Sequence, residues 1–150
     1  MKKAKIYLDM CCFNRPYDDQ TQQRIQLEAV TKLMVQSYIV ERHIDFVWSY
    51  VLEFENAKNP FLEKQNTILA FKRFACEIVH PNPVIEETAK HLQNEGLKAY
   101  DALHIACAIF ANCDYFLTVD DKVLNKQCYE VKITDPVTFI NQWLKERRTP

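Results

Sequence analysis

The chain has 150 residues, of which 48% are hydrophobic and only one is a glycine. This length suits one domain that buries about two-thirds of its unfolded surface, and the composition excludes a disordered or loop-dominated protein. With 19 Lys and Arg against 20 Asp and Glu, no global basic field attracts nucleic acid, so a polyanionic partner needs a local patch or a metal ion. We therefore expect residues 1–150 to form a single domain.

Two features concern the cell compartment. No apolar run approaches the roughly 18 residues that span a membrane, and the start of the chain is too weakly apolar for a signal peptide. The six cysteines include the adjacent pair Cys11–Cys12, a spacing that suits neither a C-x-x-C redox site nor a zinc site. We predict a cytoplasmic protein with no membrane partner, reduced and mostly buried thiols, and a Cys11–Cys12 pair that packs behind any site.

Strand and helix patterns alternate in the first third of the chain. A short β-prone run over residues 6–9 ends in an aspartate, and a polar loop follows over 14–20. Apolar residues at three- and four-residue spacing predict an amphipathic helix over 21–42. Residues 44–48 predict a second strand, after which Ser49 is a plausible N-cap of a helix. Strand, helix and strand in this order favour a right-handed crossover and a parallel pair.

The same alternation continues to the end. The elements predicted along this part are a helix over 61–74, a strand over 77–80, a helix over 84–94 with Gly96 in its C′ position, a buried apolar helix that Asp101 opens, a strand over 115–119, an edge strand over 129–133 and a helix over 136–147. The whole order predicts an α/β fold: a three-layer α/β/α sandwich with a mostly parallel central sheet of about five strands.

Several carboxylates stand where a parallel sheet places its ligands. The acids that follow a strand or lie near the start of a helix are Asp9, Glu53 or Glu55, Asp101, and Asp120 or Asp121. The carboxyl ends of parallel strands and the amino ends of the following helices share one edge, so these acids can converge. Clustered carboxylates repel one another and call for a cation, and hard oxygen ligands suit Mg²⁺ or Mn²⁺ rather than zinc.

Each acid also has a purely structural interpretation. Asp101 can be the N-cap of the apolar helix, and Asp120 and Asp121 can be turn residues without a partner. Asp9 is harder to explain in this way, because an aspartate directly after an apolar strand is disfavoured in the sheet and costly to bury. Asp9 is therefore the strongest single candidate.

Three polar residues are candidates for supporting the acids. His104 follows Asp101 by three residues, which fits either a D-x-x-H metal pair or a core histidine satisfied by a hydrogen bond. Thr118 can orient a nearby acid or water, or be an ordinary strand threonine. Asn14, just past the first strand, can bind a ligand or form a turn.

Four segments carry a family resemblance. In chain order they look like the four acidic motifs of the PIN domain: Ile6–Asp9, Ser49–Glu55, Tyr100–Ala106 and Leu117–Asp120. The likeness covers essentially the whole chain, and Asp-Ala-Leu-His-Ile-Ala is its most specific piece. The resemblance implies a Mg²⁺- or Mn²⁺-dependent ribonuclease, often the toxin half of a bacterial toxin–antitoxin pair of the VapC-like group.

Carried over position by position, the resemblance implies that the catalytic and metal-binding acids are Asp9, Glu55, Asp101 and Asp120. The second acid is ambiguous. Ser49 stands six residues before Glu55, as PIN domains often have it, whereas Glu53 keeps an apolar residue directly after the acid. We take Glu55 as the second acid and Glu53 as the alternative.

These observations give one hypothesis and two rivals. The hypothesis is hydrolysis of RNA, with an antitoxin protein and a homodimer as further partners. Arg15, Lys98, Lys122 and Lys126 are candidates for phosphate contacts, but solvation at the surface is the more common role of such residues. The first rival is a catalytically silent PIN-like module that binds RNA or protein. The second is a phosphotransfer domain, which the sequence disfavours because Asp9 lacks an Asp-x-Asp partner and the pair Asp120–Asp121 follows a later strand.

Overall fold

The computed structural model describes residues 3–128 and 130–147, and its centre is one parallel sheet. The strands are β1 (Lys5–Leu8), β2 (Asp45–Ser49), β3 (Glu77–Val79), β4 (Tyr115–Leu117) and β5 (Lys132–Thr134). Their order is β3-β2-β1-β4-β5, and each of the four pairings is parallel. The strand that ends at Asp9 is therefore the middle strand of the sheet, with Tyr7 in register with Val47 on one side and Phe116 on the other.

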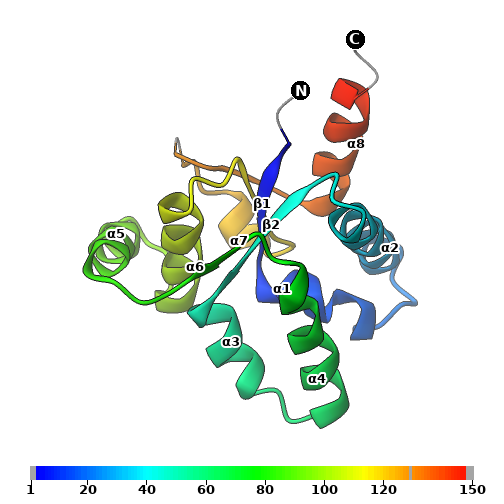
Figure 1. Cartoon of the computed structure of the whole chain (residues 1–150), viewed down its shortest axis with the longest axis horizontal. Coiled ribbons are helices and arrows are strands. Elements are labelled where there is room, and N and C mark those ends of the chain that lie inside the picture. The colour runs from blue at the N-terminus through cyan, green and yellow to red at the C-terminus, as the bar shows by residue number, and fades with distance from the viewer. Residues whose placement is uncertain (1–2, 129, 148–150) are drawn as a thin grey trace.

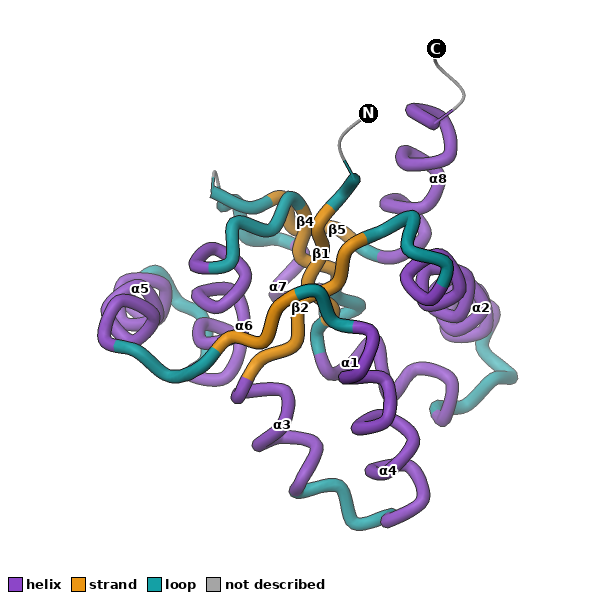
Figure 2. The backbone as a smooth tube through the Cα atoms, in the orientation of Figure 1, coloured by secondary structure: helices purple, strands orange, loops and turns teal. Residues whose placement is uncertain are grey.

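Helices cover both faces of this sheet. The helices are α1 (Met10–Asn14), α2 (Gln23–Val40), α3 (Tyr50–Ala57), α4 (Leu62–Phe71), α5 (Pro83–Asn94), α6 (Ala99–Phe110), α7 (Asp121–Leu124) and α8 (Pro136–Arg147), with short 3₁₀ turns at Arg15–Tyr17 and Lys72–Phe74. Figure 1 shows α5 and α6 on one side of the strands and α2 and α8 on the other, while α1, α3 and α4 gather toward one end. Figure 2 shows the strands enclosed between these helices. The predicted three-layer α/β/α sandwich is confirmed.

The core explains why these segments fold as they do. Aromatic rings of Phe13, Phe46, Trp48 and Phe71 pack edge to face or tilted, with centroids 5.1 to 6.4 Å apart. Such contacts add to the free energy gained by burying the rings. Helix α6 is buried along most of its length, as its nearly continuous apolar sequence predicts. This packing fixes α6 against the sheet.

Two predicted helix ends are confirmed. The Ser49 Oγ accepts a hydrogen bond from the Leu52 N–H at 3.1 Å, which makes Ser49 the N-cap of α3. Gly96 lies one residue past the C-cap of α5 with φ of +105°, a conformation that glycine adopts without steric cost.

Other local predictions are wrong. Asp101 is not an N-cap, because α6 begins at Ala99 and Lys98 holds the N-cap position. The expected loop over 14–20 begins with helical backbone, since Asn14 ends α1 and a 3₁₀ turn follows. Burial of Met10, Cys12 and Phe13 against the core stabilises α1. Tyr129, at the start of the predicted last strand, lies outside the described residues.

In the part of the chain that the structure describes, no helix is both long enough and apolar enough to cross a lipid bilayer.

Candidate active site

Asp9 follows the middle strand directly, and the residue is 6% exposed. Its Oδ1 accepts a hydrogen bond from the Met10 N–H at 2.8 Å, and its Oδ2 accepts one from Thr118 Oγ1 at 2.9 Å. The Cys11 Sγ lies 3.4 Å from the same Oδ2. These neutral donors fix the orientation of the carboxylate and satisfy part of its hydrogen-bonding capacity without supplying a positive charge.

Four acids line one pocket at this edge of the sheet. The pocket has a volume of about 430 Å³, and the acids that line it are Asp9, Glu55, Asp101 and Asp120. They come from four places in the chain: the end of β1, the second turn of α3, the first turn of α6 and the N-cap of α7. We call this hollow the acidic pocket. It forms because parallel strands end, and the following helices begin, at the same edge.

The two glutamates of α3 have different surroundings. Glu55 lines the acidic pocket, and its Oε1 lies 2.5 Å from His104 Nε2. Glu53 instead accepts hydrogen bonds from Lys72 Nζ at 2.6 Å and from Trp48 Nε1 at 3.4 Å. The hydrogen bond from Lys72 lowers the pKa of Glu53. The structure thus brings Glu55 to the other acids and places Glu53 in a salt bridge outside the pocket.

His104 is buried and hydrogen-bonded at both ring nitrogens. Nδ1 lies 2.6 Å from the Tyr7 hydroxyl, which in turn lies 2.6 Å from Ser49 Oγ, and Nε2 contacts Glu55. Burial alone would lower the pKa of His104, but the hydrogen bond to Glu55 and the charge of Asp9 raise it overall. Both nitrogens already have partners, so the geometry favours the hydrogen-bonded core histidine over the D-x-x-H metal pair.

The remaining supporting residues also lie here. Thr118 is buried; besides bonding Asp9, its Oγ1 accepts a hydrogen bond from the Asp120 N–H at 3.2 Å. Asp120 Oδ1 accepts one from the Lys122 N–H at 2.9 Å, so Asp120 caps α7 and also lines the acidic pocket. Asn14 lines the pocket from the end of α1.

Charge in the acidic pocket is poorly balanced. Burial, then the charges of Asp9 and Asp120, raise the pKa of Asp101. Lys58 is the only lysine or arginine among the described residues that line the pocket. Its Nζ donates a hydrogen bond to the Tyr100 hydroxyl at 2.8 Å, and Lys58 forms no ion pair with the described acids of the pocket. The pocket therefore has an excess of negative charge.

The donor set suits a divalent metal ion. Carboxylate oxygens are the ligands that Mg²⁺ and Mn²⁺ prefer, and a cation would offset both the burial and the repulsion that raise the pKa of Asp101. Among residues 3–128 and 130–147, however, no group of three or more His, Cys, Asp or Glu side chains is already close enough to hold a metal. The chemistry of the acids fits such an ion, and binding it would require them to draw together.

The sequence did not single out several residues of this site. Lys58 follows Glu55 by three residues on the same face of α3, which is the signal that could have revealed it. Cys11 was expected behind the site, but it lines the acidic pocket and its Sγ lies 3.3 Å from Thr118 Oγ1; Cys12 is buried as predicted. The four basic residues expected to contact phosphate, Arg15, Lys98, Lys122 and Lys126, do not line the acidic pocket.

The sequence match decides the family. A model of the PIN domain matches residues 6–127, a span that contains all four acids. The chain belongs to the PIN domain family. PIN domains are generally nucleases, so this is a member of a nuclease family.

Known structures share the fold of this PIN domain. One match is a chain in the crystal structure of VapBC2 from Rickettsia felis bound to a DNA fragment from their promoter, with a TM-score of 0.54 and 14% sequence identity. The alignment covers 87% of this chain and 98% of that chain. At this identity the likeness supports the fold. No curated protein matches the chain significantly by sequence.

Proposed function

We propose that this PIN domain is a divalent-metal-dependent endoribonuclease that hydrolyses phosphodiester bonds in RNA. The observation that carries the proposal is the acidic pocket, where acids from four separate elements line one hollow that contains a single lysine. A purely structural set of acids would be paired with cations or spread over the surface. Membership of a nuclease family supports the same conclusion.

The residues of the acidic pocket have distinct roles in this proposal. Asp9, Glu55, Asp101 and Asp120 would hold Mg²⁺ or Mn²⁺, which supplies positive charge for the phosphate and lowers the pKa of a water molecule. Thr118 and the Met10 N–H keep the Asp9 carboxylate in one orientation. His104, itself held by Tyr7, orients Glu55. Lys58, at the rim, contacts the RNA backbone.

A cleavage assay tests the proposal directly. Purified protein should cut single-stranded RNA when Mn²⁺ is added, and Asp9→Asn and Asp101→Asn should each lower the rate roughly a hundredfold, because each removes charge from the proposed metal site. Asp121→Asn is the matched control, since this acid pairs with Arg24 at 2.7 Å outside the pocket. Circular dichroism checks that each variant is folded. Undiminished cleavage by either Asp9→Asn or Asp101→Asn shows that the proposed site is wrong.

We also propose that the enzyme is the toxin of a toxin–antitoxin pair. The shared fold with a chain of the VapBC2 complex supports this role. Exposed apolar side chains on α2, including Leu27, Val30 and Leu33, offer a surface for an antitoxin or for a second copy of the chain. If the neighbouring reading frame encodes a small DNA-binding protein, expression with that protein should suppress RNA cleavage, and light scattering of the purified chain measures its oligomeric state.

One observation favours a second candidate function. Because no preformed metal group exists among the described residues, the chain could be a PIN-like module that binds RNA or protein without cleaving it. Isothermal titration calorimetry separates the two functions. Uptake of Mn²⁺ at millimolar concentration or below supports the ribonuclease, and its absence, together with RNA binding, supports the silent module.

A further inference from the structure

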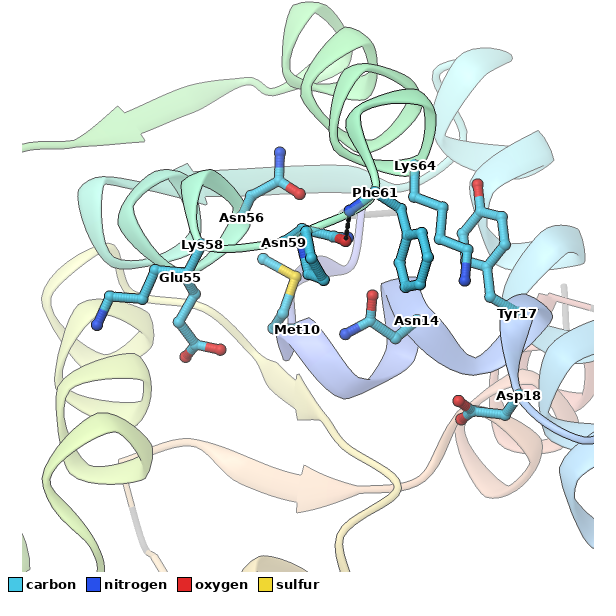
Figure 3. Close-up of a pocket in the computed structure, with 11 residues that line it drawn as sticks. Met10, Asn14, Tyr17, Asp18, Glu55, Asn56, Lys58, Asn59, Phe61 and Lys64 are labelled. Atoms are coloured by element: carbon cyan, nitrogen blue, oxygen red, sulfur yellow. Dashed lines mark hydrogen bonds between the residues drawn. The ribbon is translucent and has the colours of Figure 1, made fainter.

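A second pocket adjoins the acidic pocket. It has a volume of about 330 Å³ and lies between α1 with its following 3₁₀ turn and the connection from α3 to α4 (Figure 3). Met10, Asn14, Glu55 and Lys58 line both pockets. A chain molecule bound over the acids can therefore continue into this hollow, which we call the aromatic pocket.

Two exposed rings form one end of the aromatic pocket. Tyr17 is 41% exposed and Phe61 is 60% exposed. The Lys64 Nζ lies 4.8 Å from the centroid of the Tyr17 ring and 4.5 Å from that of the Phe61 ring, and Figure 3 shows it between them. Asn59 Oδ1 accepts a hydrogen bond from the Phe61 N–H at 3.0 Å, which fixes the backbone that carries this ring. The Lys64 ammonium thus lies against both rings, and a flat ligand that enters between them would displace it.

Charge in the aromatic pocket differs from that of the acidic pocket. Lys58 and Lys64 line it, and of its two acids Asp18 is paired with Arg15 at 3.1 Å. A ligand with a negative group would complement the two lysines.

We propose that the aromatic pocket binds the nucleotide next to the cleaved phosphate, with its base stacked on Tyr17 and Phe61 and its phosphate held by Lys64 and Lys58. This inference rests on the proposed ribonuclease function. Proteins bind single-stranded RNA by combining aromatic rings that stack on bases with cations that follow the backbone. A base can enter between the rings only if it is unpaired. The substrate is therefore single-stranded at this position.

The composition favours RNA over an apolar peptide as the occupant. A different hollow on the far side of Lys58, between α3 and α6, is lined by Tyr50, Val51, Phe54, Ala99, Tyr100 and Leu103 and suits apolar groups better. The aromatic pocket instead combines two lysines with three asparagine side chains and two aromatic rings. Its position, continuous with the acids, is also where a strand of RNA must pass.

Fluorescence anisotropy with a short labelled single-stranded RNA tests the proposal. All proteins carry Asp101→Asn and are kept free of Mn²⁺ and Mg²⁺, so that the RNA stays intact during the measurement. Adding Phe61→Ala should weaken RNA binding roughly tenfold, with a similar loss for Tyr17→Ala, because each removes a stacking surface. Phe61→Trp should bind like the parent, which separates loss of the ring from misfolding. Phe110→Ala is the matched control, because Phe110 is 44% exposed and lies outside the pocket.

A second RNA isolates the role of the base. An otherwise identical RNA whose nucleotides lack their bases should bind the parent and the Phe61→Ala protein equally well. If Phe61→Ala weakens both RNAs alike, or if both alanine variants bind the intact RNA like the parent, the proposed base site is wrong. Loss of affinity for a partner protein with RNA binding intact would also overturn it and assign the rings to protein binding. In these cases cleavage by the wild-type chain leaves the proposed function standing, whereas a wild-type chain that neither binds nor cleaves RNA refutes both.

Discussion

Two regions with buried or clustered carboxylates lie side by side in this molecule, and they differ in whether arginines pair with those carboxylates. Next to the acidic pocket, Glu28 on α2 is 4% exposed and pairs with Arg15 at 3.0 Å and with Arg24 at 3.4 Å. Arg24 also binds Asp121 at 2.7 Å. We call this set the arginine network. Each of its acids pairs with an arginine. In the acidic pocket the one lysine bonds Tyr100 instead, and of the acids Glu55 lies 2.5 Å and Asp9 lies 3.9 Å from the His104 Nε2, with no arginine among the described lining residues.

The regions meet at Asp120 and Asp121, which are adjacent in the chain. Asp120 lines the acidic pocket, whereas Asp121 turns to Arg24, whose hydrogen bond lowers the pKa of the Asp121 carboxyl. The pKa of Asp101 shifts the other way, because burial and neighbouring acids disfavour its charge. Paired acids stabilise the fold, and unpaired acids at an accessible hollow cost stability. The second arrangement is the one expected of a site that binds a cation.

The largest expected effect concerns the two glutamates of α3. Glu55→Gln should lower RNA cleavage roughly a hundredfold, because it removes a charge from the acidic pocket and changes the partner of His104. Glu53→Gln should leave the rate almost unchanged, since Glu53 binds Lys72 outside the pocket. Initial rates with labelled RNA and Mn²⁺ measure both. Equal losses of cleavage rate in the two variants would show that Glu53 and Glu55 do not differ in their roles.

The next effect tests the arginine network. Glu28→Gln should lower the free energy of unfolding by roughly 2 kcal/mol, because it removes the buried carboxylate that pairs with both Arg15 and Arg24. Urea denaturation at neutral pH measures this change. A Glu28→Gln protein as stable as the wild type would show that the arginine network contributes nothing to the free energy of unfolding. The network would then not differ from the acidic pocket in its effect on stability.

The smallest effect has the opposite sign and depends on pH. Asp101→Asn should raise the stability of the metal-free protein by no more than about 1 kcal/mol at neutral pH, because it removes repulsion that solvent already screens. The pKa of Asp101 is raised by folding, so its ionisation destabilises the fold above that pKa. Below about pH 3, under the pKa of an aspartate in the unfolded chain, the carboxyl is protonated in both states and the gain should vanish.

Two comparisons complete this experiment. Asp121→Asn should not stabilise the protein, because the charge of Asp121 is paired with Arg24. Mn²⁺ should raise the melting temperature of the wild type more than that of Asp101→Asn, because the ion binds only the folded arrangement of the acids. A larger Mn²⁺ shift in Asp101→Asn than in the wild type would contradict the assignment of Asp101 as a ligand.

Much of the architecture follows from local sequence. Short runs of β-branched and aromatic residues predicted the strands, and apolar residues spaced three and four apart predicted the long helices. The alternation of strands and helices along the chain predicted a parallel sheet. Ser49 and Gly96 marked helix ends because their roles depend only on adjacent backbone. Asp9 could be located at a strand end for the same reason. That residues 1–150 form a single domain stays a prediction.

The tertiary structure decided the partners of each charge. Sequence placed Asp120 and Asp121 together, and only the approach of Arg24 from α2 draws Asp121 away from the acidic pocket. The sequence likewise does not decide whether Glu53 or Glu55 joins the other acids, because the choice depends on how α3 is rotated against α6 and the sheet. The identity of a residue and its place on an element are local properties. Which side chain compensates its charge depends on segments about 100 residues apart, brought together by packing of the whole sheet.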